Sequence, residues 1–122
     1  MTRDIEIFIE HILESINKIE EYSKSLSKEK LIKDSIIQDA IVRRIELVGE
    51  AAKNLPDDFK EKYFFIPWKE IIGTRDKIIH HYFGVNLDMI WEIITINIPD
   101  LKIKILKIKK YGMLLSQESF NQ

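Results

Sequence analysis

Side chains that can carry acid, base and charge chemistry are concentrated in one short segment of this chain. The segment contains Arg75, Asp76, His80 and Tyr82, which fall within about two turns if the chain is helical there. An imidazole can take or give a proton near neutral pH, and such transfers contribute roughly 10² to 10⁴ in rate. A guanidinium stays charged and can place two donors on the oxygens of one phosphate. The set therefore suits cleavage of an RNA phosphodiester without a metal, with His80 in acid and base catalysis and Arg75 binding the phosphate.

The spacing of these residues limits how one chain can use them. On an ideal helix, positions five apart point about 140° from each other, whereas positions four or seven apart nearly align. Asp76 therefore lies under His80, where it can orient the imidazole or pair with Arg75, and Arg75 lies under Tyr82. Cleavage needs a base for the ribose 2'-hydroxyl and an acid for the leaving 5'-oxygen, and His80 is one imidazole for both roles. Two copies of the chain would supply both groups.

Three segments beside this motif extend the pattern, at residues 45–56, 66–73 and 82–86. Together with the spacing Arg, four residues, His, one residue, Tyr, they resemble the HepT-like ribonuclease toxins of the HEPN superfamily, in the same order and over nearly the whole chain. The resemblance implies a HEPN-type helical bundle, an RNA substrate and no cofactor. It also implies a homodimer whose paired motifs form one composite cleft.

The same resemblance implies regulation through Tyr82. HepT-like toxins are paired with a minimal nucleotidyltransferase antitoxin, in a type VII toxin-antitoxin system, that transfers AMP to the motif tyrosine. An AMP group beside Arg75 would add negative charge and bulk where the RNA phosphate should bind, which is a route to inactivation. The alternative from another class is a non-catalytic helical module that binds a nucleotide or docks the nucleotidyltransferase.

The elements that must position the motif are predicted to be helices. Ile5, Ile9, Ile12, Ile16 and Ile19 recur at spacings of four and three, which indicates an amphipathic helix over residues 3–23. A second helix is expected over residues 35–54, after a short helical turn, with a candidate capping box formed by Ser35 and Gln38. Because its apolar positions cover more than one stripe, we expect it to be the most buried helix.

The motif itself is predicted to lie on a third long helix. After a short connecting helix over residues 57–63, this helix begins at Pro67 and is capped at its end by Gly84. Gly73 inside it indicates either close approach by a neighbouring helix or simple tolerance. Asn86 is the expected N-cap of a fourth helix, which Pro99 should kink or restart near residue 97.

These elements predict an all-α antiparallel bundle of four main helices plus short connecting helices. We expect one domain over residues 1–115 and a polar tail over residues 116–122. The chain has 122 residues, no cysteine and a formal net charge of −1, so any RNA binding must be local. Without a long apolar run or a signal peptide, we expect a soluble, cytoplasmic protein with no membrane partner.

Other residues with possible chemistry have a structural interpretation beside the functional one. His80 and His81 point about 100° apart, which makes the pair a poor metal site, and no metal is expected. Glu46 and Glu50 are either walls of the cleft or partners in structural ion pairs. The run of lysines between residues 102 and 110 either guides RNA or is a solvated helix face. Trp68 and Trp91, His11 and the remaining positions are expected to be core, contact or solvated residues.

Overall fold

The computed structural model describes residues 1–79 and 85–121, with side chains for residues 1–78 and 85–112. Within those ranges every regular element is a helix and no strand occurs, so the prediction of an all-helical fold is confirmed. The elements are α1 (Arg3–Ser23), α2 (Lys28–Lys33), α3 (Ser35–Asn54), α4 (Asp57–Lys62), α5 (Trp68–Ile79), α6 (Leu87–Glu92), the π-helical η1 (Ile93–Asn97) and α7 (Ile98–Asn121).

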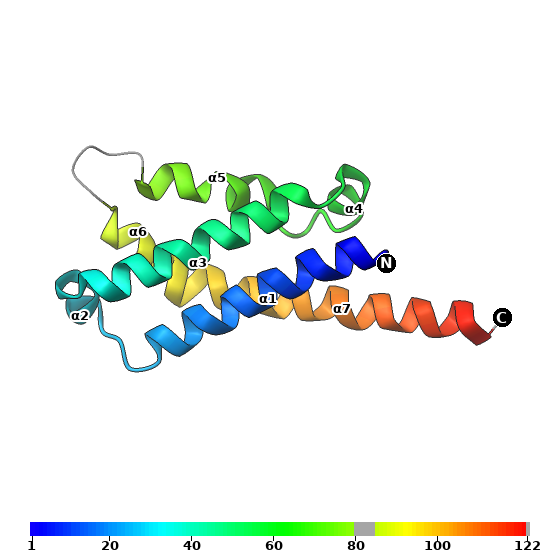
Figure 1. Cartoon of the computed structure of the whole chain (residues 1–122), viewed down its shortest axis with the longest axis horizontal. Helices are drawn as coiled ribbons and strands as arrows, with labels where there is room; N and C mark the ends of the chain where they lie inside the picture. The colour runs from blue at the N-terminus through cyan, green and yellow to red at the C-terminus, as the bar shows by residue number, and fades with distance from the viewer. Residues whose placement is uncertain (80–84, 122) are drawn as a thin grey trace.

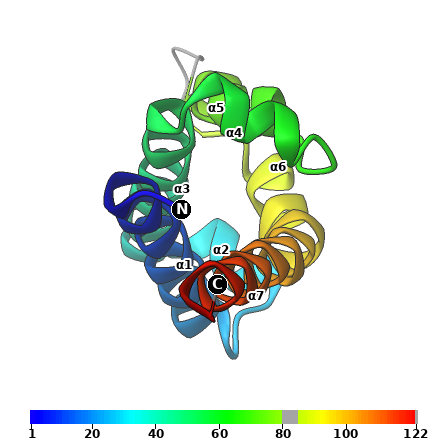
Figure 2. The same cartoon turned by 90° about the vertical axis from the view of Figure 1, so that its right-hand side faces the viewer.

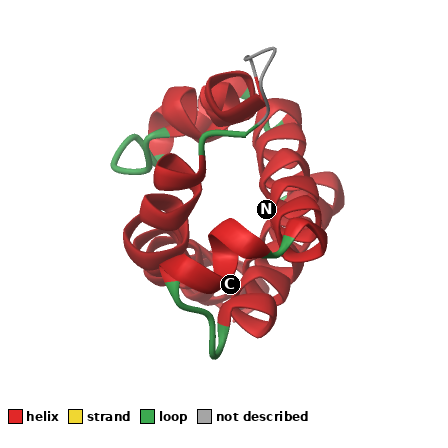
Figure 3. Cartoon of the chain, turned by 90° about the vertical axis from the view of Figure 1, so that its left-hand side faces the viewer, coloured by secondary structure: helices red, strands yellow, loops and turns green. Residues whose placement is uncertain are grey.

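The long helices run in alternating directions along the molecule. In Figure 1, α1 runs towards the end that holds α2, α3 returns from it, α5 runs back again, and α6, η1 and α7 complete the fourth passage. The view down the long axis places these four passages around a common centre (Figure 2). From the opposite end, Figure 3 shows the described residues as helices and the short loops that join them. None of the described helices is both long and apolar enough to cross a membrane.

The core is built largely from isoleucine. In α1 the residues Ile9, Ile12, Ile16 and Ile19 are each at most 1% exposed, as the spacing predicted, whereas Ile5 is half-buried. Thr2 begins this helix because its hydroxyl accepts a hydrogen bond from a backbone N–H of the first turn, at 3.3 Å. This stripe packs against α3 and α7, and burial of its apolar surface stabilises the bundle.

The start of α3 differs from the prediction by one residue. Asp34, rather than Ser35, is the N-cap, and its carboxylate accepts a hydrogen bond from the backbone N–H of Ile37 at 3.1 Å. The Gln38 side chain points back to α2 and donates to the Leu31 carbonyl at 2.7 Å, so it does not complete a capping box. Six residues of α3 are buried, although Ile36 in its first turn is 80% exposed.

The α-helical hydrogen bonding of the last passage is interrupted near Pro99. Pro99 has no N–H to donate, and its ring crowds the carbonyl four residues earlier. The chain responds with the π-helical turn η1, in which the Ile98 N–H donates to the Ile93 carbonyl. The α-helix restarts at Ile98, so the predicted kink or restart near residue 97 takes the form of a restart, and the N-cap at Asn86, which accepts from the Met89 N–H at 3.1 Å, is confirmed. From this restart α7 continues through residue 121, into the segment expected to be a polar tail.

Candidate active site

The position of α5 against α3 follows from a close backbone contact at Gly49. A Cβ atom on Gly49 would lie 3.4 Å from the carbonyl oxygen of Ile71 and 3.7 Å from that of Ile72. Both distances are ordinary van der Waals contacts, so the backbones of the two helices approach closely here. Because the two helices run in opposite directions (Figure 1), the turn before Gly49 faces the turn after Ile72. This register brings Glu46 of α3 opposite Arg75 of α5.

Glu46 lies between two arginines. One carboxylate oxygen is 3.8 Å from Nε of Arg75, and the other is 3.4 Å from a terminal nitrogen of Arg43 on the previous turn of α3. The Glu46 side chain is 19% exposed, whereas those of Arg75 and Arg43 are 57% and 61% exposed. The carboxylate therefore holds Arg75 by one edge while most of the guanidinium faces solvent, which leaves it open to an anion.

Glu46 and Glu50 differ in their contacts. Glu46 forms the ion pairs, and one of its partners is a predicted site residue. Glu50 is exposed, and its side chain forms no ion pair with a described residue. Arg43 was not among the predicted site residues, although its spacing of three from Glu46 on one helix is a signal for the pair.

Of the four predicted site residues, the structure describes Arg75 and Asp76. Arg75 and Asp76 both lie on α5 and are exposed. Asp76 makes no ion pair with Arg75, because Glu46 takes that place. His80, Tyr82 and the neighbouring His81 and Gly84 lie outside the described residues, so the relation of His80 and Tyr82 to Arg75 stays a prediction.

The close helix approach considered for Gly73 occurs at Gly49 instead. Among the described residues, no atom apart from its chain neighbours and the backbone of its own helix lies within 4 Å of a Cβ built on Gly73, so this position is a case of simple tolerance. It costs α5 roughly 1 kcal/mol relative to alanine.

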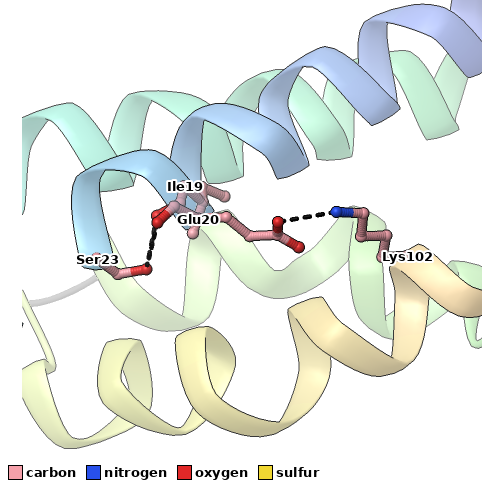
Figure 4. Close-up of polar contacts among 4 residues, drawn as sticks. All are labelled: Ile19, Glu20, Ser23 and Lys102. Atoms are coloured by element: carbon pink, nitrogen blue, oxygen red, sulfur yellow. Dashed lines mark hydrogen bonds and ion pairs between the residues drawn. The ribbon is translucent and has the colours of Figure 1, made fainter. Parts of the chain in front are cut away.

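Three lysines of α7 form ion pairs within the chain. Lys102 lies 2.8 Å from a carboxylate oxygen of Glu20 on α1, as Figure 4 shows, and Lys109 lies 2.6 Å from Glu10. Lys104 pairs with Asp100 on its own helix at 2.8 Å. These contacts offset the positive charge that would attract RNA, so they favour the structural interpretation of the run.

The burial of the two tryptophans and of His11 indicates which of these residues belong to the core. Trp68 is 7% exposed and donates from its indole nitrogen to the Tyr63 carbonyl at 3.1 Å, so it is a core residue. Trp91 is half-buried and packs against the core. His11 is exposed and lies beside Arg44 in a groove of about 440 Å³ between α1 and α3. Among the described side chains, no three acidic, histidine or cysteine residues gather in a group that could hold a metal ion.

Comparison with known proteins places this arrangement in one class. The family model "Ribonuclease HepT-like" matches residues 12–108. A protein of Methanocaldococcus jannaschii named "Gamma-glutamylcyclotransferase and putative RNase" is 51% identical over 108 residues, which cover 88% of this chain and 49% of that protein. A "Putative RNase" of Caldanaerobacter subterraneus is 50% identical over 95 residues, covering 78% of this chain and 85% of the relative.

A third relative, the "Probable ribonuclease HepT" of Thermococcus cleftensis, is 41% identical over 110 residues, covering 90% of this chain and all of that protein. The chain thus spans about half the length of the first relative and most or all of the other two. No solved structure matches it. The class is that of small helical ribonuclease-like domains, and within it the chain belongs to the HepT-like ribonuclease family.

Proposed function

We propose that this protein is an endoribonuclease toxin that cleaves RNA without a metal, through Arg75 and His80 with support from Asp76 and Tyr82. Family membership supports an RNA substrate, since the relatives are named as ribonucleases. The observation that carries the proposal is the state of Arg75, whose side chain is 57% exposed and held at one edge by Glu46. A guanidinium presented in this way suits a phosphate oxygen.

In the proposed reaction the ribose 2'-oxygen attacks the adjacent phosphorus atom. One His80 imidazole takes the proton of the 2'-hydroxyl as the P–O2' bond forms, and an imidazolium gives a proton to the 5'-oxygen as the P–O5' bond breaks. Arg75 stabilises the charge that develops on the phosphorane oxygens. The products are a 2',3'-cyclic phosphate and a 5'-hydroxyl, and no water is consumed in this step.

The proposed active unit is a homodimer. The reaction needs one base and one acid at the same phosphate, and the motif of each chain offers His80 for one of them. Two protomers related by a two-fold axis would bring two such motifs to one cleft. The exposed Arg75 side of the α3 and α5 pair is the face on which we place this cleft.

We further propose that a minimal nucleotidyltransferase antitoxin neutralises the enzyme by transferring AMP to Tyr82, as part of a type VII toxin-antitoxin pair. The phosphate of AMP would then compete with RNA for Arg75. The added phosphate would pair with the Arg75 guanidinium in the way that a phosphorylated side chain pairs with a nearby arginine.

The test is cleavage of total RNA by the purified protein in the presence of EDTA, with the product ends mapped. The wild type should leave cyclic phosphate ends, and both Arg75→Ala and His80→Ala should lose cleavage. His11→Ala is the matched control, because it removes an exposed imidazole from α1, and it should cleave as the wild type does. Equal behaviour of all four proteins, when folded and free of AMP by intact mass, would refute the nuclease and favour the docking module.

Expression in cells separates the same two possibilities. A ribonuclease toxin should arrest growth when expressed alone and lose that effect on His80→Ala. A docking module should be harmless in both forms. Growth that stays arrested with His80→Ala would contradict the catalytic role of this histidine.

A further inference from the structure

The solvent side of η1 and α7 carries an apolar stripe that nothing in the described chain covers. Ile96, Ile103 and Leu106 are 61%, 58% and 45% exposed, and Pro99 between them is also exposed. Their spacings of three and four residues put them on one side of the helix, opposite the buried residues Ile98, Leu101, Ile105 and Ile108. We call Ile96, Pro99, Ile103 and Leu106 the outer stripe.

Lysines near the outer stripe are held away from it. The aliphatic part of a lysine commonly covers apolar surface beside it. Here Lys102 and Lys109 reach to Glu20 and Glu10 on α1, with distances of 2.8 Å and 2.6 Å (Figure 4 shows the first). Lys104 is drawn to the other flank by Asp100, at 2.8 Å. The ion pairs therefore draw Lys102, Lys104 and Lys109 away from the stripe, and an apolar surface that stays exposed in this way is typical of a protein contact site.

The charges beside the outer stripe are arranged so that the stripe is complementary to itself. Asp100 lies three residues before Ile103, and its side chain stays 57% exposed although one of its oxygens pairs with Lys104 of the same helix. Lys107 lies four residues after Ile103 and is also exposed. Since they are seven residues apart, or two helical turns, they share one flank of α7. A two-fold axis near Ile103 that sets two α7 helices antiparallel would place Asp100 of each copy opposite Lys107 of the other.

We propose that the outer stripe is a contact between two copies of this chain, in which the α7 helices pack antiparallel around Ile103. Apolar residues form the centre of this contact, and the two Asp100–Lys107 pairs fix its register and direction. A parallel arrangement would place Asp100 beside Asp100 and Lys107 beside Lys107, which like-charge repulsion disfavours.

This contact is separate from the proposed RNA cleft. The α3 and α5 pair that carries Glu46 and Arg75 lies across the bundle from α7 (Figure 2). Pairing through α7 therefore leaves Arg75 accessible. The inference does not rest on ribonuclease activity, and a chain with both two-fold contacts would form assemblies larger than a dimer.

The first test is sedimentation of the wild type and Ile103→Glu over a range of concentrations. Ile103→Glu buries two carboxylates at the centre of the contact, so the dissociation constant of the larger species should rise by about tenfold or more. The matched control is Ile36→Glu, which changes an isoleucine that is 80% exposed on α3, and it should leave the constant within about twofold. A wild type that sediments no differently from Ile103→Glu overturns the proposal.

The second test uses the charge pair, with no change to the apolar residues. Asp100→Lys and Lys107→Asp should each weaken association, because each puts like charges opposite one another in a contact between identical copies. An equal mixture of the two variants should regain association, since the substituted side chain of one variant then faces the oppositely charged substituted side chain of the other. Failure of the mixture to associate better than either variant alone would overturn the antiparallel register. RNA cleavage by the single variants should continue, so this result is distinguishable from failure of the proposed nuclease.

Discussion

Replacing Glu46 by glutamine tests whether this carboxylate positions Arg75. The change keeps the size of the side chain and removes the charge that lies 3.8 Å from Nε of Arg75 and 3.4 Å from Arg43. Both arginines are more than half exposed and stay hydrated, so no buried charge is left without a partner. Two exposed ion pairs contribute about 0.2 to 1 kcal/mol each, so the free energy of unfolding should fall by about 1 kcal/mol.

The effect on RNA cleavage should be larger than the effect on stability, and it should lie in kcat. Loss of the carboxylate frees the Arg75 guanidinium to move, and a displacement of about 1 Å at a reacting group can cost on the order of 100-fold in rate. We expect kcat to fall by about tenfold or more. KM should stay equal or decrease, because a negative charge beside the phosphate site has been removed.

The assay is steady-state cleavage of a short RNA, with urea unfolding measured on the same preparations. Glu50→Gln is the matched control, because Glu50 is exposed on the next turn of α3 and its side chain forms no ion pair with a described residue. It should change kcat by less than about twofold. Unchanged kcat with a raised KM in Glu46→Gln would refute the positioning role, because it would mean that only uniform binding was lost.

Three further substitutions test the packing that supports the site, each by urea unfolding. Gly73→Ala should raise the free energy of unfolding by about 0.5 to 1 kcal/mol, because no described atom outside the backbone of α5 lies within 4 Å of the new Cβ; a decrease would contradict the open position. Trp68→Phe should lower it by about 1 kcal/mol or more through loss of the hydrogen bond to the Tyr63 carbonyl and some packing, and an unchanged value would show that this bond is not needed. Ile16→Ala should cost about 2 to 5 kcal/mol because Ile16 is fully buried, whereas Ile7→Ala on the same helix, at an exposed position, should cost far less.

Features of the fold that depend on local rules could be predicted from the sequence. The isoleucine spacing of α1 depends only on the 3.6-residue period, and its predicted limits agree with those of the structure. Asn86 and Pro99 act within one turn of themselves, through a side-chain acceptor and a missing donor. Such features need no knowledge of the other helices.

The predictions that failed involve a choice that local rules leave open. Asp34 and Ser35 are both suitable N-caps, and the structure selects Asp34 because Gln38 is drawn back to the carbonyls of α2. Ile36 belongs to the apolar pattern of α3 but lies where no helix covers it. In both cases the outcome depends on where a neighbouring helix lies, and periodicity does not contain that information.

The contact of Arg75 with Glu46 also depends on where a neighbouring helix lies. It lowers the net positive charge that we expect at the site. It depends on the register of α3 against α5, which follows from the close backbone contact at Gly49. Two arginines share one carboxylate here, so the group carries one net positive charge rather than two. The chain as a whole has a formal net charge of −1, and three of the α7 lysines are already paired. Since this group supplies one net positive charge per protomer, we expect RNA affinity to depend on both copies of the group in the proposed dimer, and to decrease when the dimer is diluted apart.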